Sequence, residues 1–461
     1  MKYIKKHFNW NTALEIFLLI GMIVVSGLVC FKQIFDHDEF EAIHTAWKML
    51  KGQTIYIDFF QQKPPFFHLT MIPLIKIFAD TVKTIFACKI YCYILFLGII
   101  CASCFISKYV FKSKTILLTA IMMLSCTLFT DKLTEIRPDT LYIFLIMISF
   151  VFLYKDIKIK KSSLLISAVF AGLSFAVLPK AVFHIAIIGV ILFIRLILKK
   201  ISLKDFFLYF LTMFIVIASF FMYFFSKSIS IEDYWFFNFT INYNFLGAFS
   251  PIKNMKLLLV TNFFLFVYAV IGLFLLKGYR QKEICFAALI LYFSVFLVNV
   301  PNRQYYVTSI PFIAMIASNA IKKIHIFNKA EFLILIFLLL YPVKYFYNQI
   351  NTADVMKYNF KRINFVLDNT QNYDKVYDGS IDFNIFRDDV DYFWFSIRPN
   401  GAAESYRKLR PREYDIYSII EEQKPKIIYT KRLSFISEYI INHYSHTQYD
   451  GILIRNENVE G

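Results

Sequence analysis

The chain alternates long apolar stretches with short polar connections. A helix needs about 20 mostly apolar residues to cross roughly 30 Å of hydrocarbon, and many of these stretches approach that length with almost no charge. We predict eleven membrane spans, at residues 13–31, 85–106, 115–130, 138–154, 163–178, 181–198, 205–226, 256–276, 284–300, 304–320 and 331–347. The spans around Pro179 and Asn302 abut with almost no loop, and each such run is interpreted as two helices joined by a tight turn.

The polar connections carry a regular charge signal. Short loops rich in Lys and Arg mark the cytoplasmic side of a membrane protein. Such groups occupy the N-terminus and every second connection: Lys2, Lys5 and Lys6; Lys108, Lys112 and Lys114; Lys155, Lys158, Lys160 and Lys161; Arg195, Lys199, Lys200 and Lys204; Lys277, Arg280 and Lys282; Lys322, Lys323 and Lys329. The alternation predicts a cytoplasmic N-terminus. It puts the loop after the first span, the loops 135–139 and 227–255, and the C-terminal region outside.

The first outward loop, residues 32–84, is predicted to hold two helices that lie in the membrane interface. Apolar and aromatic residues recur at helical spacing in its first part, with charged residues away from that face. The apolar face consists of Phe40, Ile43, His44, Trp47 and Leu50, and the charged positions are Glu41, Lys48 and Lys51. A tryptophan-bearing amphipathic helix suits the headgroup layer. A second such piece, residues 66–79, precedes the next span.

Residues 348–461 have a different composition, with more Asn, Asp and Tyr and no long apolar run. Short β-prone runs at 375–377, 426–430 and 451–455 alternate with helical stretches at 354–367, 413–423 and 432–443. Turn signals stand at 378–379, 398–401 and 450–451. This rhythm predicts a small extracytoplasmic α/β domain after a mostly α-helical transmembrane domain of residues 1–347.

Composition agrees with a multi-pass membrane protein. Of the 461 residues, 58% are hydrophobic and the mean hydropathy is +0.54, which excludes a soluble globule. The net charge of +17 follows from the basic cytoplasmic loops and does not indicate nucleic-acid binding. All seven Cys lie in or beside predicted spans, so disulfides are not expected in the outward region. Cys101 and Cys104 form a CxxC inside a span and are interpreted as inert thiols.

An acidic cluster follows the first span directly, at Asp36, His37, Asp38 and Glu39. Carboxylates at a membrane boundary cost free energy and indicate a functional site. A general base that deprotonates a hydroxyl nucleophile is the functional interpretation, since partial desolvation raises a carboxylate's pKa usefully. Helix capping by Asp and Glu in a first turn is the alternative, above all for Glu39.

Four cations at outward helix junctions are candidate phosphate ligands. They are Lys63 beside Pro64-Pro65, Arg137 before Pro138-Asp139, Lys180, and Arg303 before Gln304-Tyr305. A cation at a helix N-terminus opposes the helix dipole unless it has an anion to hold. Asp139 and Tyr305, beside these cations, are candidate substrate contacts together with Asp36 and His37. An ordinary interfacial lysine is the alternative for Lys63.

These features indicate a membrane enzyme with an acid–cation cluster at the outer interface. Nucleotide sugars are not normally supplied outside the cytoplasm, so a transferase working there needs a donor that reaches it through the bilayer. A sugar linked to a lipid phosphate meets this need.

The first loop also resembles a known family. Asp38-Glu39, Lys51-Gly52, Tyr56-x-Asp58-Phe59-Phe60 and Lys63-Pro64-Pro65 are similar to the first outward loop of GT-C membrane glycosyltransferases. The closest group is the family 39-like and aminoarabinose-transferase-like enzymes, which are related to protein O-mannosyltransferases. The resemblance implies an inverting transfer from a polyprenyl-phosphate sugar to a glycan, lipid or protein hydroxyl at a bacterial plasma membrane. It implies Asp38 as the base, Glu39 as an acceptor or substrate contact, and Lys63 as a donor-phosphate ligand.

The sequence departs from parts of this family at two positions, since other relatives have His at the Lys63 position. Aminoarabinose-type relatives have an acidic residue before the Lys-Pro pair, where this chain has Gln62. A divalent metal therefore stays an open question, with His37, His44 and His68 as candidate ligands. Two other functions remain open: a lipid-linked oligosaccharide flippase and a polysaccharide polymerase. Flippases usually carry ionisable groups near the bilayer midplane in broken helices, whereas here the charges gather at one face.

Overall fold

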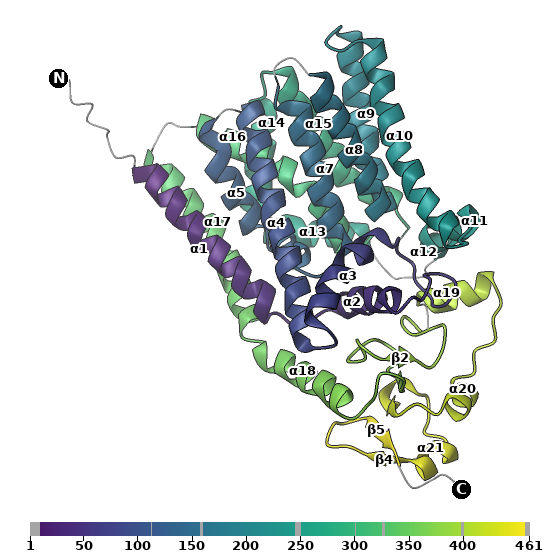
Figure 1. Cartoon of the computed structure of the whole chain (residues 1–461). Helices are drawn as coiled ribbons and strands as arrows, with labels where there is room; N and C mark the ends of the chain where they lie inside the picture. The colour runs from purple at the N-terminus through teal and green to yellow at the C-terminus, as the bar shows by residue number, and fades with distance from the viewer. Residues whose placement is uncertain are drawn as a thin grey trace.

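The computed structural model describes residues 10–111, 113–156, 160–244, 250–299, 301–324, 328–397 and 401–456. Most of the helices stand side by side in one bundle (Figure 1). Its longer helices are α1 (Trp10–Lys32), α4 (Val82–Phe111), α5 (Ile116–Ser125), α7 (Pro138–Tyr154), α8 (Lys161–Val177), α9 (Val182–Ile197), α10 (Leu203–Ser226), α13 (Pro251–Thr261), α14 (Phe263–Phe274), α15 (Tyr279–Ser294), α16 (Ile310–Lys323) and α17 (Asn328–Ile350). Short helical pieces connect them: η1 (Ser113–Thr115), α6 (Thr127–Leu133), η2 (Pro179–Ala181), α11 (Ile231–Trp235), η3 (Phe236–Thr240), α12 (Ile241–Tyr243), η4 (Val295–Leu297) and η5 (Arg303–Thr308).

Every predicted span coincides with a helix or with a pair of consecutive helices. By length and composition, four helices of the described chain can cross a membrane, or up to six if each of two bent pairs forms one span. The number eleven therefore stays a prediction, while the helical character of each stretch is confirmed. Of the charges used for orientation, Lys2, Lys5, Lys6, Lys112 and Lys158 lie outside the described residues.

Two predicted spans are bent where straight helices were expected. The pair α5 and α6 turns by 79° at Cys126, and the pair α13 and α14 turns by 92° at Asn262. The Asn262 side chain donates to the Leu258 carbonyl at 3.1 Å, and the Thr130 hydroxyl donates to the Leu124 carbonyl across the first bend. Polar side chains that bond to helix carbonyls compete with the backbone ladder and bend helices.

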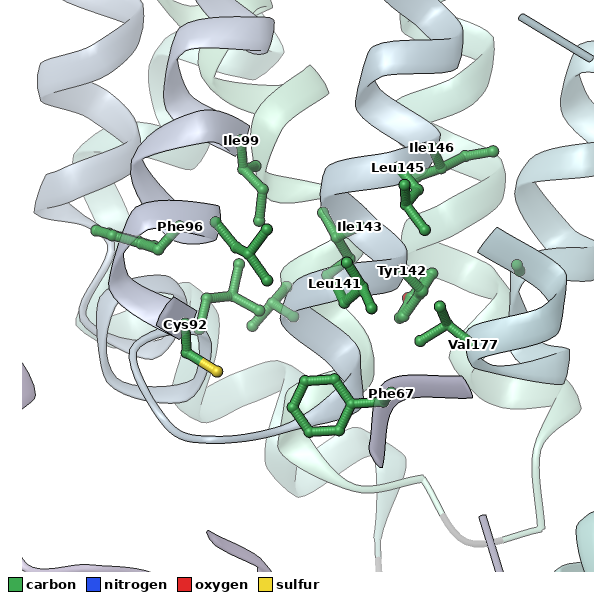
Figure 2. Close-up of a cluster of buried hydrophobic side chains, with 14 of the residues drawn as sticks. Phe67, Cys92, Phe96, Ile99, Leu141, Tyr142, Ile143, Leu145, Ile146 and Val177 are labelled. Carbon is green, nitrogen blue, oxygen red and sulfur yellow. The ribbon is translucent and has the colours of Figure 1, made fainter. Parts of the chain in front are cut away.

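Two helices of the first loop, α2 (His37–Leu50) and α3 (Phe66–Phe78), cross one end of the bundle (Figure 1). A capping box begins α2: the Asp36 side chain accepts from the Asp38 amide, and the Glu39 side chain accepts from the Asp36 amide. Figure 2 shows apolar side chains packed between α4 and α7, with the Phe67 ring of α3 below them. This packing holds the loop against the membrane domain.

Helix α2 is buried on all sides, contrary to the half-exposed interfacial helix that the pattern predicts. Glu41 and Lys48, expected on the polar face, are 2% and 3% exposed. The C-terminal region covers one side of the helix, where Lys48 and His44 contact Asp389 at 2.7 and 2.8 Å. Glu41 pairs instead with Lys63 of the same loop. The Trp47 indole donates to Asp80 at 3.0 Å and lies inside the protein, so it is not exposed to headgroups.

The C-terminal region begins with α18 (Ala353–Asp368) and lies beyond α2 (Figure 1). Its five-stranded sheet has the order β2-β1-β3-β5-β4, parallel between β2, β1 and β3 and antiparallel between β3, β5 and β4. The strands are β1 (Lys375–Tyr377), β2 (Asp388–Asp389), β3 (Ile427–Tyr429), β4 (Tyr444–His446) and β5 (Ile452–Arg455), and the helical pieces are α19 (Ala402–Leu409), α20 (Ile416–Gln423), η6 (Thr430–Arg432) and α21 (Glu438–His443).

The predicted strands and the helices at 354–367 and 413–423 are present, whereas the stretch predicted as a helix at 432–443 is an α-helix only at Glu438–His443. Strands β2 and β4 and helix α19 were not predicted. Gly379 and Gly451 have positive φ angles of 73° and 78°, as the predicted turns require. Of the turn predicted at 398–401, residues 398–400 lie outside the described residues.

Candidate active site

Acidic and basic side chains meet where the start of α2 approaches the loop between α6 and α7. Asp36 and Asp38 come from the α2 start, and Arg137 stands directly before α7, where Pro138 occupies the first helical position. Arg137 contacts Asp38 directly and Asp36 at 3.3 Å. The tertiary fold thus brings together two residue groups about 100 positions apart.

Of the two acids predicted as catalytic residues, Asp38 and Glu39, Asp38 is the more accessible. Its side chain is 36% exposed, with Arg137 on one carboxylate oxygen and Lys63 Nζ 3.8 Å from the other. Burial by itself would raise the pKa of Asp38, but the positive charges of Arg137 and Lys63 outweigh it and hold the pKa well below its usual range. Asp38 is therefore ionised at neutral pH, as a proton acceptor must be.

Lys63 is positioned by its own loop. The Gln61 side chain accepts from the Lys63 amide at 3.2 Å, and the Tyr56 hydroxyl donates to the Lys63 carbonyl at 2.9 Å. The ammonium group lies 3.0 Å from Glu41, a residue that the sequence assigned only to a polar helix face. Burial raises the pKa of Glu41 to about 7, with the charge of Asp38 acting in the same direction and that of Lys63 opposing it.

Glu135 and Lys132 form a second group of charges beside Arg137. Glu135 contacts the Arg137 Nε at 2.5 Å and Lys132 at 2.6 Å, and Lys132 also lies 3.6 Å from Asp36. Burial raises the pKa of Glu135 to about 7 against the opposing charges of Arg137 and Lys132. Lys132 was missed as a cluster member, and Glu135 only marked an outward loop. The sequence contains a partial indication of their role, because Lys132 and Glu135 both stand in the short polar run before Arg137.

Asp139, Lys180 and Tyr305 form an adjoining group. Lys180 contacts Asp139 directly and lies over the Tyr305 ring, 4.5 Å from its centroid. Arg303 is exposed at the start of η5, which packs against α6. Among the described residues, the structure gives Arg303 no ion pair with the cluster, whereas Lys63, Arg137 and the neighbouring Lys180 each pair with an acid. The role of Arg303 as a phosphate ligand stays a prediction.

Glu39 has a structural position, and its predicted role as a catalytic or substrate-contacting residue stays a prediction. Its carboxylate is fully buried, accepts from the Ile136 amide at 2.8 Å, and pairs with Lys89 at 2.5 Å. It also closes the capping box. Glu39 therefore joins α2, α4 and the loop before α7, and the capping alternative describes it better.

We expect replacing Glu39 with Gln to destabilise the fold. The change leaves the Lys89 ammonium buried without its counter-charge, and breaking a buried ion pair on one side costs about 3–5 kcal/mol of unfolding free energy. Thermal unfolding in detergent measures the loss. The double change Glu39→Gln with Lys89→Met should recover much of it. Glu232→Gln, at an exposed pair with Arg410, is the matched control and should cost at most about 1 kcal/mol. Equal losses in both single variants would contradict the structural role.

The three histidines proposed as metal ligands are far from equivalent. His37 pairs with Asp382 of the C-terminal region at 2.9 Å, and this hydrogen bond raises the pKa of His37. Both His44 ring nitrogens have protein partners, Ile385 and Asp389, and His68 is buried against Ala42. No group of three or more His, Cys, Asp or Glu side chains in the described part of the chain is arranged to hold a metal ion.

The segment 227–255 contacts the first loop through Asn238 and Asn242. Asn238 is buried and donates to the Tyr56 hydroxyl at 2.9 Å. Trp235 is exposed and stacked on Phe239, so it is the one aromatic of this pair open to a ligand or to lipid headgroups. Residues 245–249 lie outside the described part.

Comparison with known proteins identifies the fold. No family model and no curated protein matches the sequence. The structure is similar to ArnT from Cupriavidus metallidurans bound to undecaprenyl phosphate, with a TM-score of 0.71 and 10% identity over 98% of this chain and 99% of that one. The apo form of the same protein gives a TM-score of 0.69 at 11% identity, over 96% and 98%.

A second similar structure is the archaeal oligosaccharyltransferase AglB from Archaeoglobus fulgidus, in complex with an inhibitory peptide and a dolichol-phosphate. Its TM-score is 0.56 at 10% identity, over 91% of this chain and 70% of that one. The chain therefore has the GT-C fold of membrane glycosyltransferases, as its first loop predicts. The ArnT likeness extends over nearly the whole length, including the C-terminal region.

Proposed function

We propose that the protein is an integral membrane glycosyltransferase that moves a sugar from a polyprenyl-phosphate donor to a hydroxyl group of a glycan, lipid or protein. A half-exposed carboxylate, Asp38, between the cations Arg137 and Lys63 is the observation that carries the proposal. The similar ArnT structure contains undecaprenyl phosphate, which supports a donor of this class. The transferred group is a hexose or a pentose.

Asp38 acts as the general base in this proposal. It accepts the proton of the acceptor hydroxyl as that oxygen attacks the anomeric carbon, and the bond from this carbon to the lipid phosphate breaks in the same step. The configuration inverts, and no protein nucleophile is needed. Arg137 and Lys63 stabilise the charge that builds up on the departing phosphate.

Donor binding would also activate the base. Without a donor, Arg137 and Lys63 are neutralised by carboxylates, and they depress the pKa of Asp38. A phosphate that draws these cations toward itself adds negative charge nearby and weakens their hold on Asp38. Its pKa then rises, and the proton acceptor becomes stronger only when the donor is present.

The site would lie at the outer face of a bacterial plasma membrane, with the N-terminus in the cytoplasm and residues 348–461 outside. The alternation of basic loops supports this orientation. Residues 1–347 would form the catalytic membrane domain. The contacts from Asp382 and Asp389 to α2 suggest that the C-terminal domain helps to hold the base loop in position.

Two alternative functions predict different results. A polysaccharide polymerase would share the donor chemistry and differ in the acceptor. A flippase is favoured by the two bent helix pairs, since broken helices are common in transporters. The charge cluster at one end of the bundle favours the enzyme.

Reconstitution tests the proposal. Purified protein in liposomes is given a polyprenyl-phosphate sugar, and mass spectrometry follows the free lipid phosphate and the acceptor. Release of lipid phosphate coupled to glycosylation of an acceptor supports a transferase. Movement of the intact lipid-linked sugar across the bilayer without release would instead establish a flippase. Envelope glycans of cells with and without the gene identify the acceptor.

The neighbouring Glu41 should make donor use depend on pH. With its pKa raised to about 7, Glu41 loses its proton as pH rises through neutrality, and the resulting carboxylate competes with the donor phosphate for Lys63. We expect the donor KM to rise between pH 6 and 8 by about threefold or more. Glu41→Gln should flatten this rise in the donor KM and leave the pH dependence of kcat unchanged. The same slope in both proteins would remove Glu41 from donor recognition.

A further inference from the structure

A cavity of about 390 Å³ lies at the end of the bundle opposite α2. It opens where α8 begins, α9 ends and α10 begins, three points that lie close together in Figure 1. Its polar lining consists of Lys161, Lys199, Lys200, Ser202 and Asp205, and Leu164 belongs to its apolar wall. The cavity is remote from the acid–cation cluster and has no part in the proposed transfer.

The lining carries cations that the protein leaves unneutralised. Within the described ranges, neither Lys161 nor Lys199 has an ion-pair partner. Lys200 lies over the Tyr279 ring, 3.8 Å from its centroid. The one acid, Asp205, is engaged at the start of its own helix, where it accepts from the Ser202 hydroxyl at 2.7 Å. Three lysines therefore line the cavity, and its one carboxylate is hydrogen-bonded at the start of α10.

The start of α8 adds to the positive potential. Lys160 occupies the N-cap position without a side-chain hydrogen bond to the helix, and Lys161 is the first helical residue. The helix dipole favours an anion here, and the Asp156 carboxylate, which accepts from the Ser163 hydroxyl at 2.7 Å, is one such charge. A second anion would offset the remaining positive charge of the two lysines.

The surface beside the cavity is apolar. Ile197, Leu203 and Phe207 are 64%, 57% and 62% exposed on the outer faces of α9 and α10. Leu164, in the cavity wall, is buried at 1% exposure. A ligand with a phosphate head and acyl chains fits both features, because the head meets the lysines while the chains follow these helix faces.

We propose that this cavity binds the phosphate headgroup of an anionic membrane lipid. Basic pockets between membrane helices on the cytoplasmic side bind such headgroups in general. The predicted orientation puts Lys161, Lys199 and Lys200 on that side. A soluble phosphate compound would use the lysines but not the apolar faces, so the lipid is the occupant we propose.

The test compares the full-length protein with the variant Lys161→Gln/Lys199→Gln/Lys200→Gln. Each is purified in a neutral detergent and titrated with phosphatidylglycerol, with phosphatidylcholine, and separately with inorganic phosphate. Thermal unfolding midpoints and native mass spectrometry measure binding. The matched control, Lys108→Gln/Lys114→Gln/Lys282→Gln, removes the same charge from exposed positions that basic loops also mark as cytoplasmic but that do not line the cavity.

We expect the wild type and the control to bind phosphatidylglycerol in preference to phosphatidylcholine, and the cavity variant to bind it at least about tenfold more weakly. Equal midpoints of all three proteins in phosphatidylcholine would show that the cavity variant is folded. An equal loss in the control would mean that lipid binding follows total charge, which overturns the cavity as a site. Equal stabilisation by inorganic phosphate at the same concentration would overturn the lipid as its ligand.

Discussion

Replacing Asp38 with Asn is expected to lower the rate of sugar transfer by at least about two orders of magnitude, because general acid–base catalysis contributes roughly 100- to 10,000-fold. The amide keeps the size of the carboxylate but cannot accept the hydroxyl proton. The effect should appear in kcat, with the donor KM little changed or lowered, since Arg137 and Lys63 lose one competing anion. Single-turnover transfer with a purified polyprenyl-phosphate sugar measures it.

The control for this experiment is Asp58→Asn. Asp58 stands in the same loop, is exposed, and accepts a hydrogen bond from the Thr54 amide. It should retain most of the activity. Turnover close to wild type in the Asp38 variant would remove Asp38 from the mechanism and leave the loop with an electrostatic role alone.

Replacing Lys63 or Arg137 with Gln is expected to raise the donor KM by at least about tenfold, with a smaller effect on the acceptor KM. Hydrogen bonds from a charged donor to a phosphate contribute about 1.5–3 kcal/mol each. The donor titration is performed at saturating acceptor. Arg137→Lys should also be impaired, because a lysine cannot reproduce the forked contacts of the guanidinium with Asp38 and Glu135.

Lys76→Gln is the matched control for these cation variants. Lys76 is an exposed lysine on α3 in the same outward loop. Folding must be checked for Arg137→Gln, since that change exposes Glu135 and Asp38 to each other without their shared cation. An unchanged donor dependence in folded variants of both residues would mean that Lys63 and Arg137 only anchor loops.

The sequence by itself determined the class of the protein. Apolar stretches of this length must satisfy their backbone hydrogen bonds internally, and each predicted span coincides with one helix or with two consecutive helices. The resemblance of the first loop, carried by motifs such as Lys63-Pro64-Pro65, predicted the GT-C fold that the structural comparison confirms. Local turn chemistry at Gly379 and Gly451 likewise predicted where β1 ends and where β5 begins.

Side-chain partners across long sequence distances could not be predicted in this way. Glu39 and Glu41 stand on the same helix turn as Asp38 and look equivalent in sequence. The structure buries Glu39 against Lys89 from α4, and sets Glu41 beside Lys63. Which acid remains accessible depends on what packs over α2, and that covering includes residues more than 300 positions away.

Tertiary structure alone therefore decided which side chains of the cluster are paired and which acid is accessible. The hydrophobic pattern is a property of each segment, whereas the pKa and accessibility of a carboxylate depend on every charge and surface around it. Arg303 and Arg137 were alike as cations before a helix, yet only Arg137 reaches the acids. The burial of α2 by the C-terminal region could not be predicted for a similar reason, because an amphipathic pattern cannot distinguish a lipid surface from a protein surface.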